Sequence, residues 1–283
     1  MLDTYQDPKF AVKRFAKELI IYLGSLLRIR PNTRALVKQW SGLKITKKNN
    51  AIIIAGGPSY NNELAEYIKK NRRFFDVFAI NFYCLNKRAE EIIPDFYVLS
   101  DPAHIETKDA SIKEKNRNLL AYLIAHPLIT LCTPIDMWKK EFFKNKNASI
   151  NFDDAEVLFS KNIDPVFPRG YTSNTAFKAI AIAVKLGYKN IYILGLDYDY
   201  PRMMILNKDN RLFMNESHHY DSNLVDYSHI FKNVSHALHW WSFDYLTLMK
   251  LKKDNLFNVT NTSLVDAFTR MSVENFLGLK HDS

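Results

Sequence analysis

The sequence predicts an α/β protein whose mostly parallel sheet is covered by helices on both faces, and three observations support this prediction. Short apolar segments rich in β-branched residues alternate along the chain with longer segments of helical periodicity. The connections between them are short, as in strand–helix–strand units. Polar residues and glycines follow directly after several of the apolar segments, at the sheet edge where parallel sheets bind ligands.

Six apolar segments are predicted as strands, namely Ala51–Ala55, Asp76–Ile80, Phe96–Leu99, Ala121–Ala125, Ile191–Leu194 and Leu256–Val259. Four segments have helical periodicity, namely Asn61–Lys70, Ile135–Phe143, Asn174–Leu186 and His236–Leu251. The three consecutive isoleucines at 52–54 have no polar alternation, so the first strand is expected to be central and buried on both faces. Residues 200–235 show neither pattern and are predicted to form an irregular lid over the ligand edge.

The composition is that of a folded globular protein, since 47% of the 283 residues are hydrophobic and 13% are aromatic. Cys84 and Cys132 both stand in apolar surroundings, which indicates buried thiols in a reducing compartment. Met1–Pro8 is polar and acidic, unlike a secretory signal, and no apolar run approaches the roughly 20 residues of a membrane span. We therefore expect a cytoplasmic protein.

Positive charge is concentrated in residues 1–50, which hold 11 basic and 3 acidic residues and so contribute +8 of the net charge of +9. Apolar residues recur there at helical spacing, at Val12, Phe15, Leu19, Tyr22, Leu23, Leu26 and Leu27. We interpret residues 1–50 as a basic amphipathic helical appendage to a catalytic domain at 51–283. Residues 9–38 could lie on an anionic membrane surface, at the inner face of the cell membrane, or pack on the body or on a second subunit of a homo-oligomer. Nucleic acid is not an expected partner, because no nucleic-acid-binding motif accompanies the charge.

The first predicted strand ends in a glycine-rich turn, Gly56-Gly57-Pro58-Ser59. The two glycines allow a sharp turn and a close approach of ligand to backbone. Pro58 and Ser59 suit the first turn of a helix, whose N–H groups and dipole attract anions. The turn therefore indicates a phosphate site, although an ordinary tight strand–helix turn would use the same residues.

Other candidate residues follow later strands or precede helices. Asn81 follows the second strand, and Ser100 and Asp101 follow the third. Thr172 or Ser173 could cap the helix at 174–186, or hold a carboxylate or phosphate together with Arg169. A zinc site is not indicated by the histidines at 218, 219, 229, 236 and 239, so we interpret one of them as a general base.

Asp197 and Asp199 follow the predicted strand Ile191–Leu194 as an Asp-x-Asp pair. Such a pair can hold a divalent ion that bridges a diphosphate. Asp197 could equally brace its loop through backbone hydrogen bonds.

Taken in order, four segments resemble the bacterial sialyltransferases of glycosyltransferase family 42, and more loosely other Rossmann-like glycosyltransferases of surface-polysaccharide biosynthesis. They are Ile53–Ser59, Phe75–Asn81, Thr172-Ser173 and Ala181–Asp197, within a resemblance that covers about Ala51 to Phe268. The resemblance implies a Rossmann-like fold of a GT-A-like variant. It also implies an inverting enzyme that moves a nonulosonic acid, such as sialic acid, from a CMP-sugar donor to a cell-surface glycan or glycolipid.

The same resemblance implies roles for individual residues. The donor nucleotide would be bound by Gly56, Gly57, Pro58, Ser59, Asn81, Ser100 and Asp101, the last standing where the family has an asparagine. Thr172 and Ser173 would hold the sugar carboxylate, near Arg169. Tyr198 or Tyr200 would stabilise the leaving phosphate. His236 would deprotonate the acceptor hydroxyl, with His239 and His219 as rival candidates.

No metal or other cofactor is expected for this reaction, because a nucleoside monophosphate is already a good leaving group. Two alternatives stay open. One is a metal-dependent nucleotide-sugar transferase or pyrophosphokinase, with Mg²⁺ or Mn²⁺ on Asp197 and Asp199. The other is a non-catalytic nucleotide-binding subunit of glycan assembly.

Overall fold

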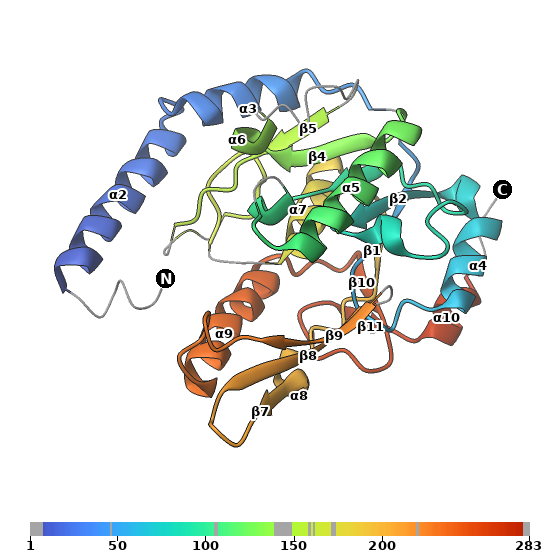
Figure 1. The fold of residues 1–283 in the computed structure, drawn as a ribbon. Coiled ribbons are helices and arrows are strands. Elements are labelled where there is room, and N and C mark those ends of the chain that lie inside the picture. The colour runs from blue at the N-terminus through green and yellow to red at the C-terminus, as the bar shows by residue number, and fades with distance from the viewer. Residues whose placement is uncertain are drawn as a thin grey trace.

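An eight-stranded sheet forms the centre of the computed structural model, with strand order β11-β10-β6-β1-β2-β3-β4-β5 (Figure 1). Each neighbouring pair runs parallel, which confirms the predicted α/β class. The strands are β1 (Asn50–Ile54), β2 (Phe75–Ile80), β3 (Phe96–Val98), β4 (Thr130–Pro134), β5 (Ser149–Phe152), β6 (Asn190–Leu194), β10 (Leu256–Val259) and β11 (Thr269–Met271). The structure describes residues 8–279 except 46, 105–106, 139–148, 158–159, 161, 171–173 and 219–220.

β1 is the central strand, and the order of the sheet reverses beside it. Ile52 lies opposite Val77 of β2 on one side and Tyr192 of β6 on the other. From β1 the chain adds β2 to β5 in one direction and then returns to add β6, β10 and β11 in the other. Open parallel sheets bind ligands at the carboxyl ends of the strands where this reversal occurs.

Alternate residues of β1 enter two different hydrophobic cores. Ala51 and Ile53 pack into the core beneath one set of helices, α7 (Thr175–Leu186) and α9 (Val234–Lys250). Ile52 and Ile54 pack into the core beneath the other set, α4 (Asn62–Lys70), α5 (Ala110–Ala125) and α10 (Val273–Leu277). All four side chains are fully buried, as the uninterrupted apolar run predicts.

One predicted strand is wrong, because Ala121–Ala125 is the last part of helix α5. A short apolar run fits a strand or a buried helix equally well. Here Asp109 starts a helix upstream by accepting hydrogen bonds from the N–H groups of Ser111 and Ile112. The sequence does not predict β4 and β5, whose apolar residues are interrupted by threonine, proline and asparagine. The predicted helix Ile135–Phe143 is described as α6 (Ile135–Trp138), and its other residues lie outside the described part.

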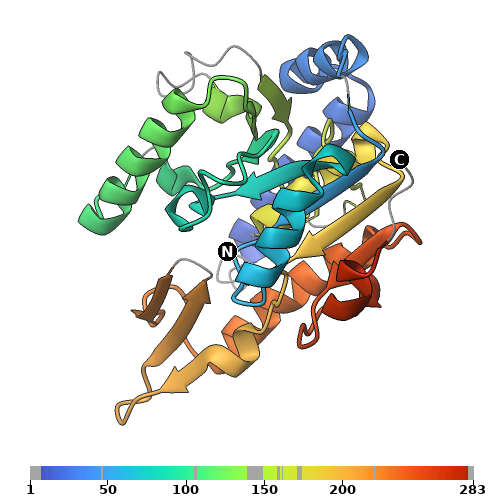
Figure 2. The ribbon, with the colours of Figure 1, turned by 90° about the vertical axis from the view of Figure 1, so that its right-hand side faces the viewer.

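The irregular structure predicted for residues 200–235 is wrong, because they hold a three-stranded antiparallel sheet and a short helix, α8 (Tyr200–Met203). Their predicted place at the ligand edge is confirmed, since several of them line a cavity there. The strands are β7 (Met204–Leu206), β8 (Leu212–His218) and β9 (Asp221–Asp226). Leu212 and Met214 of β8 pack with Phe231 and Trp241 in a small core of their own. Both views show this second sheet as an arm set apart from the main sheet (Figures 1 and 2). The sequence concealed it because its apolar residues stand in runs of two or three, without the alternation typical of a half-buried strand.

The N-terminal segment forms two helices, α2 (Pro8–Leu26) and α3 (Pro31–Ser41). α3 covers the edge strand β5, where the indole Nε1 of Trp40 donates to the carbonyl of Asn151 at 2.8 Å. Arg30, just before α3, forms an ion pair with the buried Asp153. α2 lies at the periphery of the molecule (Figure 1). None of the described helices has the length and hydropathy needed to cross a bilayer.

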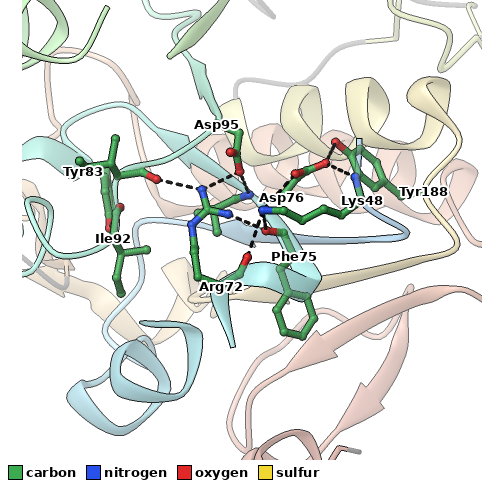
Figure 3. Close-up of polar contacts among 10 residues, drawn as sticks. Lys48, Arg72, Phe75, Asp76, Tyr83, Ile92, Asp95 and Tyr188 are labelled. Carbon is green, nitrogen blue, oxygen red and sulfur yellow. Dashed lines mark hydrogen bonds and ion pairs between the residues drawn. The ribbon is translucent and has the colours of Figure 1, made fainter. Parts of the chain in front are cut away.

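At the amino ends of the strands, charged side chains pair with one another and with backbone carbonyls (Figure 3). The Nζ of Lys48 donates to the carbonyls of Arg72 and Phe75 and lies 3.5 Å from the Asp76 carboxylate. The hydroxyl of Tyr188 donates to the same carboxylate at 2.9 Å. Arg72 and Asp95 form a second ion pair at 2.7 Å. We call these residues (48, 72, 76, 95 and 188) the amino-edge network.

Candidate functional site

A cavity of about 1100 Å³ opens at the carboxyl edge of the main sheet. Its walls come from the residues that follow β1, β2, β3 and β6, from the first turn of α7, and from the arm of β8 and β9. The parallel topology thus gathers polar residues that lie far apart in sequence. The volume suits a ligand the size of a nucleotide sugar.

Glycines allow the loops after β1 and β6 to touch at the switch point. The N–H of Gly57 donates to the carbonyl of Gly195 at 2.8 Å, and a Cβ on Gly57 would lie only 2.6 Å from that oxygen. Gly195 has a φ of +71°, a conformation that favours glycine. These glycines are therefore required by loop-to-loop packing.

Asp197 braces the glycine turn. One carboxylate oxygen accepts the N–H of Ser59 at 2.9 Å, and the other accepts the hydroxyl of Thr260 at 3.3 Å. The N–H groups of Gly57 and Ser59 are thus satisfied inside the protein. Gly56, Gly57 and Pro58 line the cavity, whereas Ser59 is not among the lining residues.

His218 stands at the end of β8, against the glycine turn. Its Nδ1 lies 3.2 Å from the carbonyl oxygen of Gly56. A carbonyl only accepts hydrogen bonds, so Nδ1 carries the proton and Nε2 holds the lone pair. A Cβ on Gly56 would also lie 3.2 Å from Nδ1, so a larger residue there would push the imidazole back by a few tenths of an ångström.

Asn81 follows β2 with a φ of +49°, an uncommon conformation for a residue other than glycine. The hydroxyl of Tyr97 donates to its carbonyl at 2.8 Å and holds the backbone there. His104 lies with Nε2 3.5 Å from the side-chain oxygen of Asn81 and Nδ1 3.3 Å from that of Asn116. Burial lowers the pKa of His104 and favours its neutral form. A neutral ring has one N–H, so His104 can donate to only one of these two oxygens.

The first turn of α7 faces the cavity through Asn174, Thr175, Ala176 and Lys178. The helix is capped by Asn174, whose side chain accepts the N–H of Ala176 at 2.8 Å, so the predicted cap at Thr172 or Ser173 is wrong. Asparagine is as good a cap as serine or threonine, and it stands directly before the helix. Thr172 and Ser173 lie outside the described residues. Ser100 is joined to this turn by a 2.8 Å hydrogen bond to Thr175.

Four charged residues cluster in the cavity wall, where Arg169 and Lys178 are buried and two acidic partners are half-buried. We call Asp154, Glu156, Arg169 and Lys178 the charged quartet. Arg169 donates to Asp154 at 2.7 Å and to Glu156 at 2.8 Å, and Lys178 lies 2.9 Å from Asp154. Burial, reinforced by the charge of Arg169, lowers the pKa of Lys178 to about 8. Although burial acts to raise it, the pKa of Asp154 is lowered by Lys178 and Arg169. The predicted carboxylate ligand Arg169 thus lines the cavity but already pairs with two carboxylates.

The two predicted tyrosines line the cavity near the arm. The hydroxyl of Tyr198 donates to the buried Asp244, and burial together with that carboxylate raises the pKa of Tyr198. Tyr198 has a φ of +51°, so the loop after β6 holds a strained backbone next to the cavity. The ring of Tyr200 stacks on Trp241 with centroids 5.1 Å apart.

Two of the three predicted catalytic histidines lie away from the cavity wall. His236 is in the first turn of α9, where its Nδ1 accepts the N–H of Lys232 at 3.3 Å and its ring meets Phe231. His239 is exposed one turn further along, and neither residue is among those that line the cavity. His219 lies outside the described residues.

Asp101 and the Asp197–Asp199 pair bear on the metal-dependent alternative. Asp101 lines the cavity and accepts the N–H of Ala103 at 2.8 Å. Asp199 also lines the cavity, but both oxygens of Asp197 are engaged as described above. Within the described ranges, no three histidine, cysteine or acidic residues are grouped so as to hold a metal ion. The residues present do not fit a two-aspartate metal site.

Sequence reasoning did not single out five of the residues just described. His104 and His218 gave no signal that separates them from the other histidines. Lys178 did give one, because it is the only charged residue in the first ten residues of an otherwise apolar helix. Asp154 and Glu156 follow β5, a strand that the sequence does not predict.

The family described as "MptE-like: 6-hydroxymethylpterin diphosphokinase MptE-like" matches residues 26–203, more than half of the chain. No curated protein matches the sequence. Among solved structures, the chain is similar to the MAf glycosyltransferase from Magnetospirillum magneticum AMB-1, with a TM-score of 0.49 and 15% identity. That alignment covers 85% of this chain, which spans 36% of the length of that protein.

Proposed function

The chain belongs to the 6-hydroxymethylpterin diphosphokinase MptE-like family, and we propose that it is a transferase that binds a nucleotide-activated donor in the cavity at its sheet edge. The observation that carries this proposal is the meeting of three features at the switch point. They are the first turn of α7, the buried cations Arg169 and Lys178, and the ring of His218. The positive end of a twelve-residue helix favours an anion, and a histidine that lines the same cavity would supply a base.

The donor that this arrangement suits best is a CMP-activated nonulosonic acid. Such a donor carries two anionic groups, a phosphate and the sugar carboxylate. The first turn of α7 would hold one of them, and Asn81, which lines the same cavity, would bind the nucleotide. The resemblance of Ile53–Ser59, Phe75–Asn81 and Ala181–Asp197 to the bacterial sialyltransferases supports this choice.

The reaction would be a single displacement with inversion. Nε2 of His218 takes the proton of an acceptor hydroxyl, and the acceptor oxygen forms a bond to the anomeric carbon. The bond from that carbon to the phosphate oxygen breaks, and CMP leaves with the electron pair. We assign stabilisation of the leaving phosphate to the α7 turn, because the hydroxyl of Tyr198 is engaged by Asp244. The acceptor would be a glycan or glycolipid.

A second candidate is transfer of a diphosphate from ATP to a hydroxymethyl group, which the family's description favours. It would use the same cavity, but the Asp197 carboxylate already binds Ser59 and Thr260. This engagement makes diphosphate transfer the weaker candidate.

Thermal shift against CMP, UDP, GDP and ATP tests the proposal. A ligand that binds only the folded state at 100 times its Kd adds about 2.7 kcal/mol of stability, which raises Tm measurably. We expect the largest rise with CMP, followed by release of CMP from the sugar donor when acceptor is added. A larger rise with ATP, followed by release of AMP, would instead support diphosphate transfer. Binding of CMP without any turnover of the sugar donor would support the non-catalytic subunit.

Two N-cap variants locate the nucleotide. Asn174→Ala removes the cap of α7 in the cavity wall, and Ser272→Ala removes the cap of α10. Each should lower stability by about 1 kcal/mol. Only Asn174→Ala should reduce the rise in Tm that CMP gives. An equal reduction in both variants would place the nucleotide elsewhere.

A further inference from the structure

Helix α2 turns an apolar face outward. Seven large hydrophobic side chains between residues 12 and 29 are exposed, namely Val12, Phe15, Ile20, Leu23, Leu26, Leu27 and Ile29. At 100° per residue, those from Val12 to Leu27 fall within an arc of roughly 140°. On the opposite side of the helix, Glu18 and Ser25 are buried. This is the reverse of a helix that packs its apolar face on a protein body.

The charges around this face have one sign. Lys13 and Lys17 border the apolar arc and are exposed, and Arg28 follows at the end of the helix. Between residues 9 and 48 the chain holds 11 basic residues and one acidic residue, Glu18. Glu18 is itself paired with Arg14 at 2.8 Å. The face therefore combines exposed apolar side chains with exposed positive charge at Lys13, Lys17 and Arg28.

We propose that the apolar face of α2 docks on an anionic membrane surface. The apolar arc would enter the boundary between headgroups and acyl chains, and Lys13, Lys17 and Arg28 would meet the lipid phosphates. We choose anionic lipid as the binding partner because the cations beside the apolar face attract negatively charged headgroups. A second copy of the chain, packed symmetrically through the same face, would place its own cations against those of the first copy, and the two sets would repel each other. α3 remains on β5 and holds the docked helix to the body.

Co-sedimentation of the full chain with vesicles tests this proposal. We expect binding to vesicles of phosphatidylcholine mixed with phosphatidylglycerol and much weaker binding to phosphatidylcholine alone. The charge-dependent part should fade between about 0.1 M and 1 M salt, as the Debye length falls from about 10 Å to about 3 Å. Equal binding to both vesicle types, or no binding to either, would overturn the proposal.

Two sets of substitutions assign the binding to α2. Phe15→Gln, Ile20→Gln and Leu23→Gln together should weaken binding about 100-fold or more, because each removes an inserted apolar side chain. A matched control makes the same change at three exposed apolar residues elsewhere, Ile124, Leu128 and Leu246, and should bind like the unmodified chain. Lys13→Gln with Lys17→Gln should weaken binding to anionic vesicles roughly 30-fold, which corresponds to about 1 kcal/mol for each lysine.

The oligomeric state separates the membrane from a second copy. If the unmodified chain is a dimer without lipid and the triple glutamine variant is a monomer, the face is a contact between copies and the proposal is wrong. If the triple variant fails to fold, as judged by circular dichroism, the paired lysine variant decides instead. Unchanged vesicle binding in that variant would then overturn the proposal.

Discussion

The two edges of the main sheet carry similar side chains but use them differently. At the amino edge, the network of Lys48, Asp76 and Tyr188 satisfies its charges with one another and with carbonyls (Figure 3). At the carboxyl edge, the charged quartet, Asn81 and His218 line a cavity of about 1100 Å³. Strained backbones occur there at Asn81 and Tyr198, directly beyond β2 and β6.

The difference shows how a parallel sheet separates stability from activity. Both edges hold the ends of the same strands, and both bury polar groups at a cost that hydrogen bonds must offset. At the carboxyl edge, the chain also leaves room for a ligand and keeps strained backbone beside that room. We therefore expect substitutions at the amino edge to change the free energy of unfolding, and those at the carboxyl edge to change turnover or binding. Four predictions test this division.

The largest expected effect is on turnover, at the carboxyl edge. His218→Ala should lower kcat by about 10²–10⁴-fold, the range for loss of a general base, with little change in Tm. His236→Ala and His239→Ala serve as controls and should keep most of the activity, since neither residue lines the cavity. Steady-state kinetics with the donor identified by the nucleotide screen measures all three. If only His236→Ala loses activity, His236 is the general base and the assignment to His218 is wrong.

The next effect is on stability, at the amino edge. Asp76→Asn should lower the free energy of unfolding by about 3 kcal/mol, because it leaves the partly buried Lys48 ammonium without its carboxylate. Glu91→Gln, in the more exposed Lys69–Glu91 pair, should change the free energy of unfolding much less, because solvent screens that pair. Urea unfolding measures both values, and kcat should be unchanged in both variants. A fall in kcat for folded Asp76→Asn would break the division between the edges.

Gly57→Ala should affect stability and binding together, because that residue joins the loops of the switch point. Its Cβ would press on Asp197 and lie 2.6 Å from the carbonyl of Gly195. We expect a loss of about 1–3 kcal/mol in stability and a smaller rise in Tm with nucleotide. Gly278→Ala, whose Cβ would come no closer than 3.4 Å to a neighbour, is the control. Normal nucleotide binding by Gly57→Ala would show that binding does not require the contact between the loops after β1 and β6.

The smallest effect is a pH dependence from Lys178. The pKa of Lys178 is lowered to about 8, so between about pH 8 and 10 the unfolded chain holds a proton that the folded chain has released. Stability therefore rises with pH in this window, by up to about 1.4 kcal/mol per unit. The measurement is urea unfolding at several pH values for the unmodified chain and for Lys178→Met. The free energy of unfolding of the unmodified chain should rise relative to that of Lys178→Met as pH rises. If the difference between the two free energies stays constant, the pKa of Lys178 is not lowered.

The sequence predicted the centre of the sheet well because burial on both faces leaves a plain signal. The isoleucines of β1 and the strand β6 could be located from composition alone. β4, β5 and the arm were missed because their residues are mixed, so tertiary pairing rather than local pattern makes them strands. Ala121–Ala125 shows the opposite error. Its local apolar run suggested a strand, but the chain there continues a helix that begins upstream at Asp109.

The candidate site was predictable only where residues directly follow recognisable strands. Gly56, Asn81, Asp101 and Asp197 meet that condition, and all four line the cavity. His218 and Glu156 do not, because the strands that deliver them are not visible in the sequence. Which histidine approaches the glycine turn depends on how the arm folds back, and spacing along the chain does not determine that.

The place of β1 in the sheet also has a consequence for the order in which the protein is made. One edge of β1 pairs with β2, which follows soon after, but Asn50 meets its partner in β6 only at Asn190, 140 residues later. At about 5–20 residues per second, the ribosome needs roughly 7–28 s to supply that partner. During this time the central strand has an unpaired apolar edge, the kind of surface that promotes aggregation. We therefore expect nascent chains that stop short of β6 to be insoluble without a chaperone, and the cavity to form only near the end of synthesis.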